Sequence, residues 1–348
     1  MDRQNFKAAQ GFTIVELMIA MLLGLMLSGA MVAVFVDSRQ SYNTSETVMR
    51  MQDDARQALR ELSTDLTMAG FWAELMLPVD ITPDANLAVA ANGDCGPAGV
   101  PWVYRAIVPG TSQSLALTAI DNATGAAVNA GHSCIAASQV QAGSDVIAIK
   151  RVAGTNSSCP AICPAPFDNT VDNAVYLRTN GTLGLLYRKP EAAAAAVPAP
   201  FWDWEYRPRI YYVRNFARVA GDGIPTLCRK VLLYRTTPPT MDPLVPGTTE
   251  CLAQGVESLQ IEFGLDSDSD GEPNVYVTGA TTAQMQTVVS ARLFLLLRGT
   301  DRDIQYRNDK TYQISNAPAL TPADDFHRRV FSVTVGLRNL ASLRKFGS

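Results

Sequence analysis

The stretch GFTIVELMIAMLLGLMLSGAMVAVFV, residues 11–36, determines how this chain of 348 residues is organised. Its last part, Leu17 to Val36, holds 20 residues without a charged side chain. As a helix these residues span about 30 Å, which is the thickness of the hydrocarbon core of a bilayer. A secretory signal peptide has a shorter apolar run that ends in small residues at a cleavage site. The stretch therefore predicts a helix that crosses the membrane.

Glu16 stands at the entrance of this apolar run. A carboxylate at the membrane edge is costly, and an ionisable group in such a place usually marks a function. The residues before it carry Arg3 and Lys7 against Asp2, and this positive bias predicts a cytoplasmic N-terminus with the rest of the chain facing outward. Two interpretations follow. The helix anchors one enzyme or receptor and Glu16 only reaches the headgroups, or the helix assembles with others and Glu16 has a partner.

The first 11 residues followed by FTIVEL resemble the class III signal of type IV pilins and type II secretion pseudopilins. The resemblance implies that a prepilin peptidase cuts after Gly11 and methylates Phe12, the new first residue. It also implies that Glu16, then the fifth residue, is the glutamate of this family. A cation and a carboxylate in lipid are tolerated when they are paired. We therefore expect Glu16 of one subunit to neutralise the amine of its neighbour and to set the axial step between helices.

Beyond the membrane the helix is expected to continue, because no proline occurs between Gly11 and Pro78. Apolar residues at spacings of three and four form one stripe: Val48, Met51, Ala55, Leu59, Leu62, Leu66 and Ala69. Charged residues are expected around that stripe, on the solvent side: Arg50, Asp53, Arg56, Arg60, Glu61 and Asp65. A helix from Phe12 to Phe71 is about 90 Å long. We expect its residues 12–36 in the membrane and residues 37–76 packed on a globular head.

Residues 77–348 are expected to form that head, and their patterns are those of an antiparallel sheet protein. Alternation over 259–265 and 331–337 predicts two strands, and the uniformly apolar run 288–297 predicts a central one. Residues 209–218 and 226–235 flank a Gly-Asp-Gly turn and predict a hairpin. The alanine-rich segment 190–200 predicts a surface loop, an insertion or a break between two lobes. The expected class is α+β and pilin-like, a long N-terminal helix on a large β-rich head.

Six cysteines all follow residue 90, which suits an oxidising compartment. Fifteen pairings are possible, and we favour the sequential one because each bond then closes a loop inside one local unit. The Cys-Pro-Ala-Ile-Cys segment could instead suggest a metal site. The chain has only two histidines to complete such a site, so structural disulfides are the preferred interpretation. The favoured pairs are Cys95 with Cys134, Cys159 with Cys163, and Cys228 with Cys251.

Motifs of the common catalytic sites are absent from the sequence. It contains no Gly-x-Ser-x-Gly elbow, no His-Glu-x-x-His and no Gly-rich phosphate loop. Two histidines offer little general-base capacity, and a pair of carboxylates is the remaining route to an anchored enzyme. Removal of residues 1–11 changes Lys+Arg from 29 to 27 and Asp+Glu from 33 to 32, a net charge of −5. We expect neither an enzyme nor a nucleic-acid-binding protein.

One motif suggests a cofactor. Asp266, Asp268 and Asp270 alternate with serines before Gly271, which is how a calcium loop opens. An EF-hand needs a glutamate at its twelfth position, where this chain has Val277. It also needs a helix before the loop, where we expect the strand 259–265. Two interpretations stay open. The turn binds Ca²⁺ with Glu272 or backbone carbonyls completing the shell, or it is a solvated acidic turn.

The C-terminal half resembles the PilW family of type IV pilus minor pilins. The stretches that carry the resemblance are DGIPTLCRKVLLYR (222–235), GVESLQIEFGLDSDSDG (255–271), VVSARLFLLLRG (288–299) and RRVFSVTVGLRNL (328–340).

This resemblance implies a minor pilin that joins other minor pilins, the major pilin and the assembly platform to prime pilus assembly. It also implies a place at the pilus tip, with a large adhesin, and roles in adhesion and twitching motility. The protein would sit in the inner membrane with its head in the periplasm, and then in the fibre at the cell surface. The alternatives are a type II secretion minor pseudopilin and an anchored periplasmic enzyme or adhesin.

Overall fold

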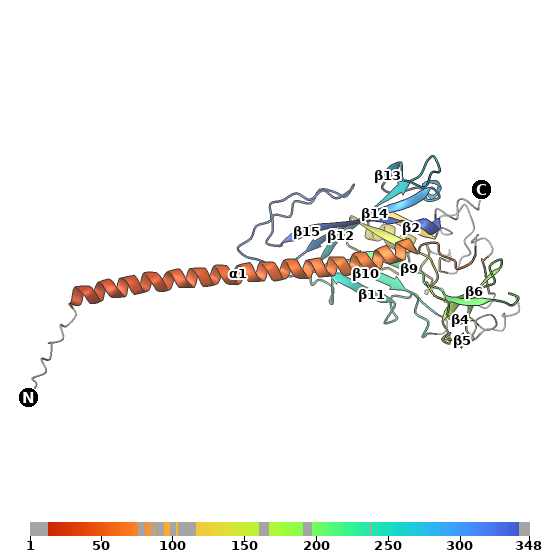
Figure 1. The fold of residues 1–348 in the computed structure, drawn as a ribbon, viewed down its shortest axis with the longest axis horizontal. Helices are drawn as coiled ribbons and strands as arrows, with labels where there is room; N and C mark the ends of the chain where they lie inside the picture. Colours follow the sequence, from red (N-terminus) through yellow and green to blue (C-terminus); the bar gives the residue numbers. More distant parts are fainter. Residues whose placement is uncertain are drawn as a thin grey trace, which may run out of the picture. The chain divides into compact units, whose positions relative to one another are not determined.

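The computed structural model describes residues 13–75, 81–84, 87, 94–97, 102–103, 116–159, 167–190, 197–236 and 239–340. Contacts between residues divide the chain into two compact units, Met1–Met49 and Arg50–Ser348. Figure 1 labels the long helix α1, which begins in the first unit, and the strands of the second unit. The second unit is called the head below.

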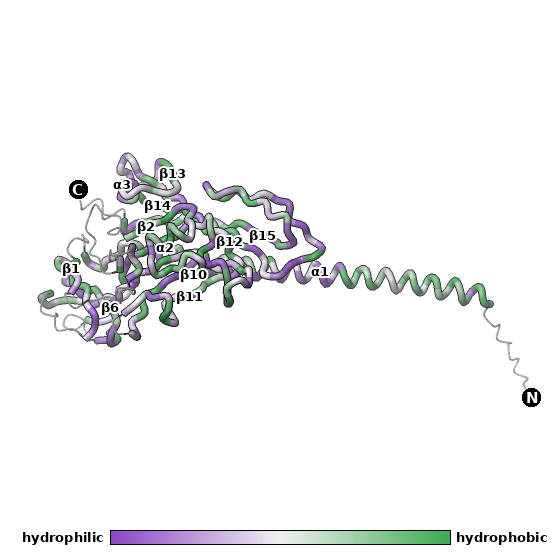
Figure 2. Tube along the Cα trace, turned by 180° about the vertical axis from the view of Figure 1, so that it is seen from behind, coloured by the Kyte–Doolittle hydropathy of each residue, from purple (hydrophilic) through white to green (hydrophobic). Residues whose placement is uncertain are grey.

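Helix α1 runs from Ile14 to Thr67. In the first unit its large apolar side chains, from Ile14 to Val36, are exposed, and Figure 2 shows this part of the helix in the colour of hydrophobic residues. The helix is long and apolar enough to cross a membrane. The hydroxyl of Ser28, a polar group inside this run, donates to the carbonyl of Gly24 at 2.8 Å, so the helix satisfies it internally.

In the head, the last turns of α1 bury one face. The buried positions recur at spacings of three and four: Met51, Ala55, Ala58, Leu62, Asp65 and Leu66. The expected stripe is therefore confirmed for most of its members, although it passes through Ala58 while Leu59 is only half-buried. One expectation was wrong, because Asp65 lies inside the head and not on the solvent side. The helix ends three residues before Gly70, whose φ of 73° turns the chain out of the helical conformation.

The sheet that receives α1 has five antiparallel strands in the order β11-β10-β9-β3-β2. Their bounds are Leu117–Ala123 (β2), Ser144–Ile149 (β3), Arg209–Arg214 (β9), Thr226–Val231 (β10) and Thr249–Gln254 (β11). The expected hairpin is confirmed as the β9–β10 pair. Its loop is organised by Asp222, whose carboxylate accepts four backbone N–H groups, from Ala217, Arg218, Val219 and Ile224.

A second antiparallel sheet has the order β13-β12-β14-β15. Its strands are Val256–Leu265 (β12), Val275–Val277 (β13), Val288–Arg298 (β14) and Arg328–Gly336 (β15). Strand β14 lies between β12 and β15, as its apolar sequence predicts. Gly255 alone separates β11 from β12, with a φ of 77°, and a Cβ there would lie 2.2 Å from the carbonyl oxygen of Arg298. Only glycine fits this close approach.

The third sheet has the order β1-β7-β6-β8-β4-β5, with β1 parallel to β7 and the other pairs antiparallel. Its strands are Ile81–Pro83 (β1), Ser158–Cys159 (β4), Phe167–Asp168 (β5), Val175–Thr179 (β6), Gly184–Arg188 (β7) and Trp202–Glu205 (β8). Residues 191–196, in the segment where a lobe boundary was expected, lie outside the described residues. A division there stays a prediction.

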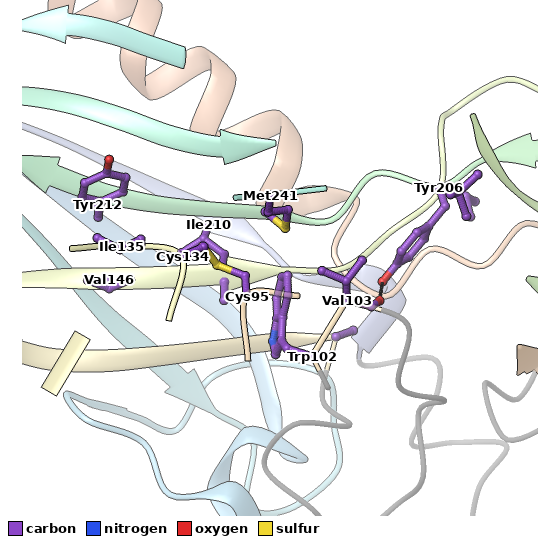
Figure 3. Close-up of a cluster of buried hydrophobic side chains, with 14 of the residues drawn as sticks. Cys95, Trp102, Val103, Cys134, Ile135, Val146, Tyr206, Ile210, Tyr212 and Met241 are labelled. Atoms are coloured by element: carbon purple, nitrogen blue, oxygen red, sulfur yellow. Dashed lines mark hydrogen bonds between the residues drawn. A yellow bond between two sulfur atoms is a disulfide. The ribbon is translucent and has the colours of Figure 1, made fainter. Parts of the chain in front are cut away.

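One cluster of buried hydrophobic side chains in the head contains the Cys95–Cys134 disulfide (Figure 3). Side chains from several strands surround it, and the hydroxyl of Tyr206 donates to the carbonyl of Val103 at 2.6 Å. The short helices α2 (Gly125–Gly131), η3 (Ala137–Gln139) and α3 (Thr282–Met285) connect strands. A long N-terminal helix with a head rich in antiparallel strands confirms the expected α+β class.

Candidate assembly site

Helix α1 begins with a capping box made by Thr13 and Glu16. Oε2 of Glu16 accepts hydrogen bonds from the backbone N of Thr13, at 3.0 Å, and from its hydroxyl, at 2.9 Å. The Thr13 hydroxyl oxygen accepts in turn from the backbone N of Glu16, at 3.3 Å. A negative side chain in the first turn also interacts favourably with the helix dipole. Glu16 therefore has a local role at the start of the helix, in addition to the intersubunit role expected from its position.

The sequence contains a signal for this box, because Thr-x-x-Glu before an apolar run is its usual pattern. The box occupies one carboxylate oxygen of Glu16, while Oε1 has no bonding partner in the described part of the chain. Gly11 and Phe12, the expected processing residues, lie outside the described residues. The exposed Glu16 side chain is thus oriented by its own helix and keeps one oxygen for another partner.

Within the head, a buried ion cluster joins the last turns of α1 to the five-stranded sheet. The carboxylate of Asp65, with a side chain only 1% exposed, accepts from Nε and Nη2 of Arg151 at 3.0 and 2.6 Å. Nη1 of Arg209 donates to both of its oxygens, at 2.9 and 2.7 Å, and the hydroxyl of Tyr211 donates to Oδ2. Arg209 and Tyr211 belong to β9, and Arg151 follows β3. These contacts explain why a charged residue lies on the buried face of the helix.

The charges of this cluster stabilise one another. Burial by itself would raise the pKa of the Asp65 carboxyl, but the positive charges of Arg209 and Arg151 and the hydrogen bond from Tyr211 hold that pKa below its usual value. Burial also raises the pKa of Tyr211, and the negative charge of Asp65 raises it further. Asp65 is therefore ionised at neutral pH and Tyr211 stays protonated as a donor.

A second ion pair lies one turn earlier on α1. Glu61 accepts from Nη1 of Arg229 at 2.9 Å, and Nε of Arg229 donates to Glu250 at 2.8 Å. Arg229 lies on β10 and Glu250 on β11. The last turns of α1 are thus bonded to two adjacent strands, β9 and β10, and to Arg151, which follows β3. Helix and sheet therefore form one structural element of the head.

Two disulfides close loops in the head, Cys95–Cys134 and Cys228–Cys251. Both are the expected pairs, and the second links cysteines that face each other in the β10–β11 register. Cys159 is also disulfide-bonded. Its expected partner, Cys163, lies outside the described residues. No cysteine is free in the part of the chain that the structure describes.

The acidic turn connects β12 to β13, as expected for a loop between strands. Asp266, Asp268 and Asp270 each offer a carboxylate oxygen, and these atoms lie within 4.8 Å of one another. Glu272 is not part of this group. Both oxygens of Asp266 already accept backbone N–H groups, from Ser269 at 2.5 Å and from Gly271 at 3.1 Å. A cation in this turn would therefore depend mainly on Asp268 and Asp270, which are exposed.

Both histidines make structural contacts. Nδ1 of His132 lies 3.1 Å from the carbonyl oxygen of Cys95, and burial lowers the pKa of this histidine to about 4. His327 lies 3.0 Å from a carboxylate oxygen of Asp303 and stacks on the ring of Tyr306. At neutral pH His132 is uncharged and is enclosed in the core.

Comparison with known families identifies the class of protein. Residues 6–32 match the family model described as Prokaryotic N-terminal methylation motif, and residues 210–339 match the one described as Type IV Pilus-assembly protein W. No curated protein and no solved structure matches the chain. The first match includes Gly11, Phe12 and Glu16, and the second extends from β9 beyond β15.

The chain is therefore a pilin related to type IV pili, with an N-terminal helix of the kind that anchors pilins in a membrane. More particularly, its residues 210–339 are similar to the PilW family, in agreement with the resemblance carried by its C-terminal strands. The members of both families are structural components of pili, and neither is a family of enzymes.

Proposed function

We propose that the protein is a minor pilin that assembles with other minor pilins and with the major pilin to prime type IV pilus assembly. The observation that carries the proposal is the presence of a prepilin-type N-terminus and a PilW-family head in one chain. Such a chain works by occupying a position in an assembly, and it needs no reacting group. A place at the pilus tip, together with a large adhesin, belongs to the same proposal.

The N-terminal residues would act in sequence. A prepilin peptidase removes residues 1–11 by cutting after Gly11 and methylates Phe12. The new amine is a cation at the membrane edge, where an unpaired charge is costly. The Glu16 carboxylate of a neighbouring subunit neutralises it. The exposed position of Glu16 supports this role, as does its Oε1, which bonds to none of the residues that the structure describes. The pairing fixes the step between adjacent apolar helices, whose other side chains offer little directional contact.

The head is proposed to lie in the periplasm before assembly and at the cell surface afterwards. An oxidising compartment is supported by the disulfides Cys95–Cys134 and Cys228–Cys251, because such bonds persist outside the cytoplasm. The ion cluster around Asp65 gives the head a rigid attachment to the end of α1. The position of this part of the helix in the fibre would then determine the position of the head's contact surfaces.

Deletion of the gene in the native bacterium tests the proposal. We expect loss of surface pili and of twitching, with protein secretion unchanged, and restoration of both by the wild-type gene. Loss of secretion with normal piliation would assign the protein to a type II secretion system. The processing step is tested separately by mass spectrometry of the envelope protein, which should begin at methylated Phe12. Gly11→Val should block this maturation, and an intact leader in the wild-type protein would contradict the pilin assignment.

A further inference from the structure

A groove of about 720 Å³ runs along the last turns of α1, on the side of β9. It lies wholly within the head, since every residue that lines it follows Arg50. Five of its lining residues are arginines: Arg56, Arg60, Arg151, Arg207 and Arg209. We call it the arginine groove. Two carboxylates also line it, so the formal charge of its described lining residues is five minus two, or +3, on a chain whose net charge is −4.

Three of the five arginines of the groove already have partners. Arg151 and Arg209 bind Asp65, and Arg207 lies 2.6 Å from a carboxylate oxygen of Glu205. The other lining carboxylate, Glu61, binds Arg229. These pairs hold the floor of the groove in place. They also leave no lining carboxylate for the arginines at its rim.

Arg56 and Arg60 form the rim of the arginine groove. They lie one turn apart on α1 and both are exposed. Neither guanidinium makes a hydrogen bond or an ion pair with another residue in the described ranges of the chain. Two like charges at positions i and i+4 destabilise a helix slightly. An anionic partner would offset this cost.

The geometry points to a carboxylate-rich protein segment as that partner. A guanidinium group presents a planar fork that pairs bidentately with carboxylate or phosphate. Between Arg56 and Arg60 the helix rises about 6 Å, which is longer than one carboxylate group and suits a segment with two or more acidic side chains. We propose that the arginine groove binds an acidic segment of a neighbouring subunit. That the neighbour is another pilin rests on the proposed function, whereas the selectivity for carboxylates does not.

Peptide binding tests the groove directly. The full chain in detergent is titrated into a fluorescent hexaglutamate peptide, and anisotropy gives the dissociation constant. Replacing Arg56→Gln and Arg60→Gln together should weaken binding about tenfold, as expected for two partly screened charge pairs. A control chain with Arg218→Gln and Arg307→Gln loses the same charge from exposed sites outside the groove. Its affinity should change less than twofold, and 0.5 M NaCl should weaken binding to the wild-type chain.

Several results would overturn the proposal. One is that the wild-type chain shows no measurable binding. Another is that the double variant Arg56→Gln, Arg60→Gln, called the groove variant, binds as tightly as the wild type. A third is that the control variant loses as much affinity as the groove variant. Displacement of the peptide by glycerol phosphate at concentrations where acetate has no effect would assign the groove to phosphate headgroups. Because the guanidinium groups of Arg56 and Arg60 bond to no other residue that the structure describes, we expect the double variant Arg56→Gln, Arg60→Gln to melt at the wild-type temperature, which shows that it is folded.

A cellular measurement separates this inference from the proposed function. The groove variant should be processed and inserted in the membrane like the wild type, while fewer partner pilins copurify with it. If the peptide binds as expected but copurification is unchanged, the occupant is not a neighbouring pilin. The minor-pilin proposal itself is judged by the gene deletion, whatever the peptide does.

Discussion

Asp65 of α1 and Arg209 of β9 form a two-point ion pair, with Nη1 of the arginine 2.9 and 2.7 Å from the two carboxylate oxygens. The residues are 144 positions apart in the chain. Their side chains are 1% and 16% exposed, so the pair is shielded from solvent. Arg151 supplies the second cation of this cluster. One carboxylate thus pairs with two guanidinium groups, and its removal should affect the whole joint between helix and sheet.

The first prediction concerns this carboxylate. Asp65→Asn leaves Arg151 and Arg209 buried without a counter-charge, which typically costs about 3 to 5 kcal/mol in the free energy of unfolding. Urea or thermal unfolding of the full chain in detergent measures the loss. Asp53→Asn, a neutralised carboxylate on the exposed face of the same helix, is the matched control and should change stability by less than about 0.5 kcal/mol. Equal stabilities of the two variants would show that the cluster does not hold the joint.

A second prediction concerns pH. The buried carboxylate of Asp145 on β3 accepts from the backbone N of Asn122 at 2.8 Å and of Ile261 at 2.7 Å, which links β3 to β12. Burial raises its pKa to about 7, although these hydrogen bonds oppose the shift. The unfolded chain releases this proton near pH 4, so between about pH 4 and 7 the folded state binds the additional proton. This group's contribution to stability should therefore decrease as the pH rises through that range.

Asp65 acts in the opposite direction, because its pKa in the folded state is lowered. Its contribution is present above about pH 4 and is lost as the pH falls through the folded pKa. The free energy of unfolding of the full chain, measured at pH 5, 6, 7 and 8, should show the decrease with pH that Asp145 causes. Asp145→Asn should flatten this decrease while leaving the loss of stability in acid unchanged. An unaltered decrease in this variant would mean that other groups cause it.

The third prediction separates the two roles of Glu16. Glutamine can replace glutamate in a capping box but carries no charge. If the charge pairs with a neighbouring amine, Glu16→Gln and Glu16→Ala should both insert in the membrane and both fail to copurify with other minor pilins. If capping is the essential role, Glu16→Gln should behave like the wild type and only Glu16→Ala should be defective. We expect the first result, since lipid offers no other compensation for the amine.

Much of the fold could be predicted because its signals are local. The apolar run gave α1, alternation gave β12 and β15, and the Gly-Asp-Gly turn gave the β9–β10 hairpin. The buried position of Asp65 could not be predicted in this way. A charged residue in a helical pattern indicates the solvent side, and the partners that reverse this lie 86 and 144 residues away. The third sheet was missed because its strands have only two to five residues each.

A similar limit applies to the candidate site. Family resemblance identified Gly11, Phe12 and Glu16, since their motif is contiguous in the sequence. The arginine groove combines α1 with segments around residues 151 and 207–209. No local pattern brings these segments together, so only the folded chain shows that the arginines share one surface.

The fourth prediction concerns the disulfides. The Cys228–Cys251 bond closes a loop with a sequence separation of 23, and replacing both cysteines with alanine should lower the free energy of unfolding by about 3 kcal/mol. Native protein taken from the envelope should contain no thiol that reacts with maleimide. The single variant Cys228→Ala should gain one such thiol, because Cys251 is exposed. Six reactive thiols in the wild-type protein would contradict an oxidised head.

The last prediction concerns the acidic turn, where we expect Asp266, Asp268 and Asp270 to bind calcium. Their carboxylates are gathered within 4.8 Å, and like charges at this distance repel one another, so a cation should stabilise the turn. Because Glu272 is not part of the group and Asp266 already accepts two backbone N–H groups, the affinity should be low, with a dissociation constant on the order of 1 mM, as in extracellular modules.

Calcium should then raise the melting temperature of the full chain in detergent, by an increment that grows with free calcium above the dissociation constant. Asp268→Ala with Asp270→Ala should abolish this increment and keep most of the stability without calcium, since the backbone bonds to Asp266 remain. Magnesium at the same concentration controls for general screening of charge and should have a smaller effect, because it demands octahedral geometry and keeps its waters. If millimolar calcium leaves the melting temperature of the wild-type chain unchanged, the turn is a solvated acidic loop that Asp266 organises by itself.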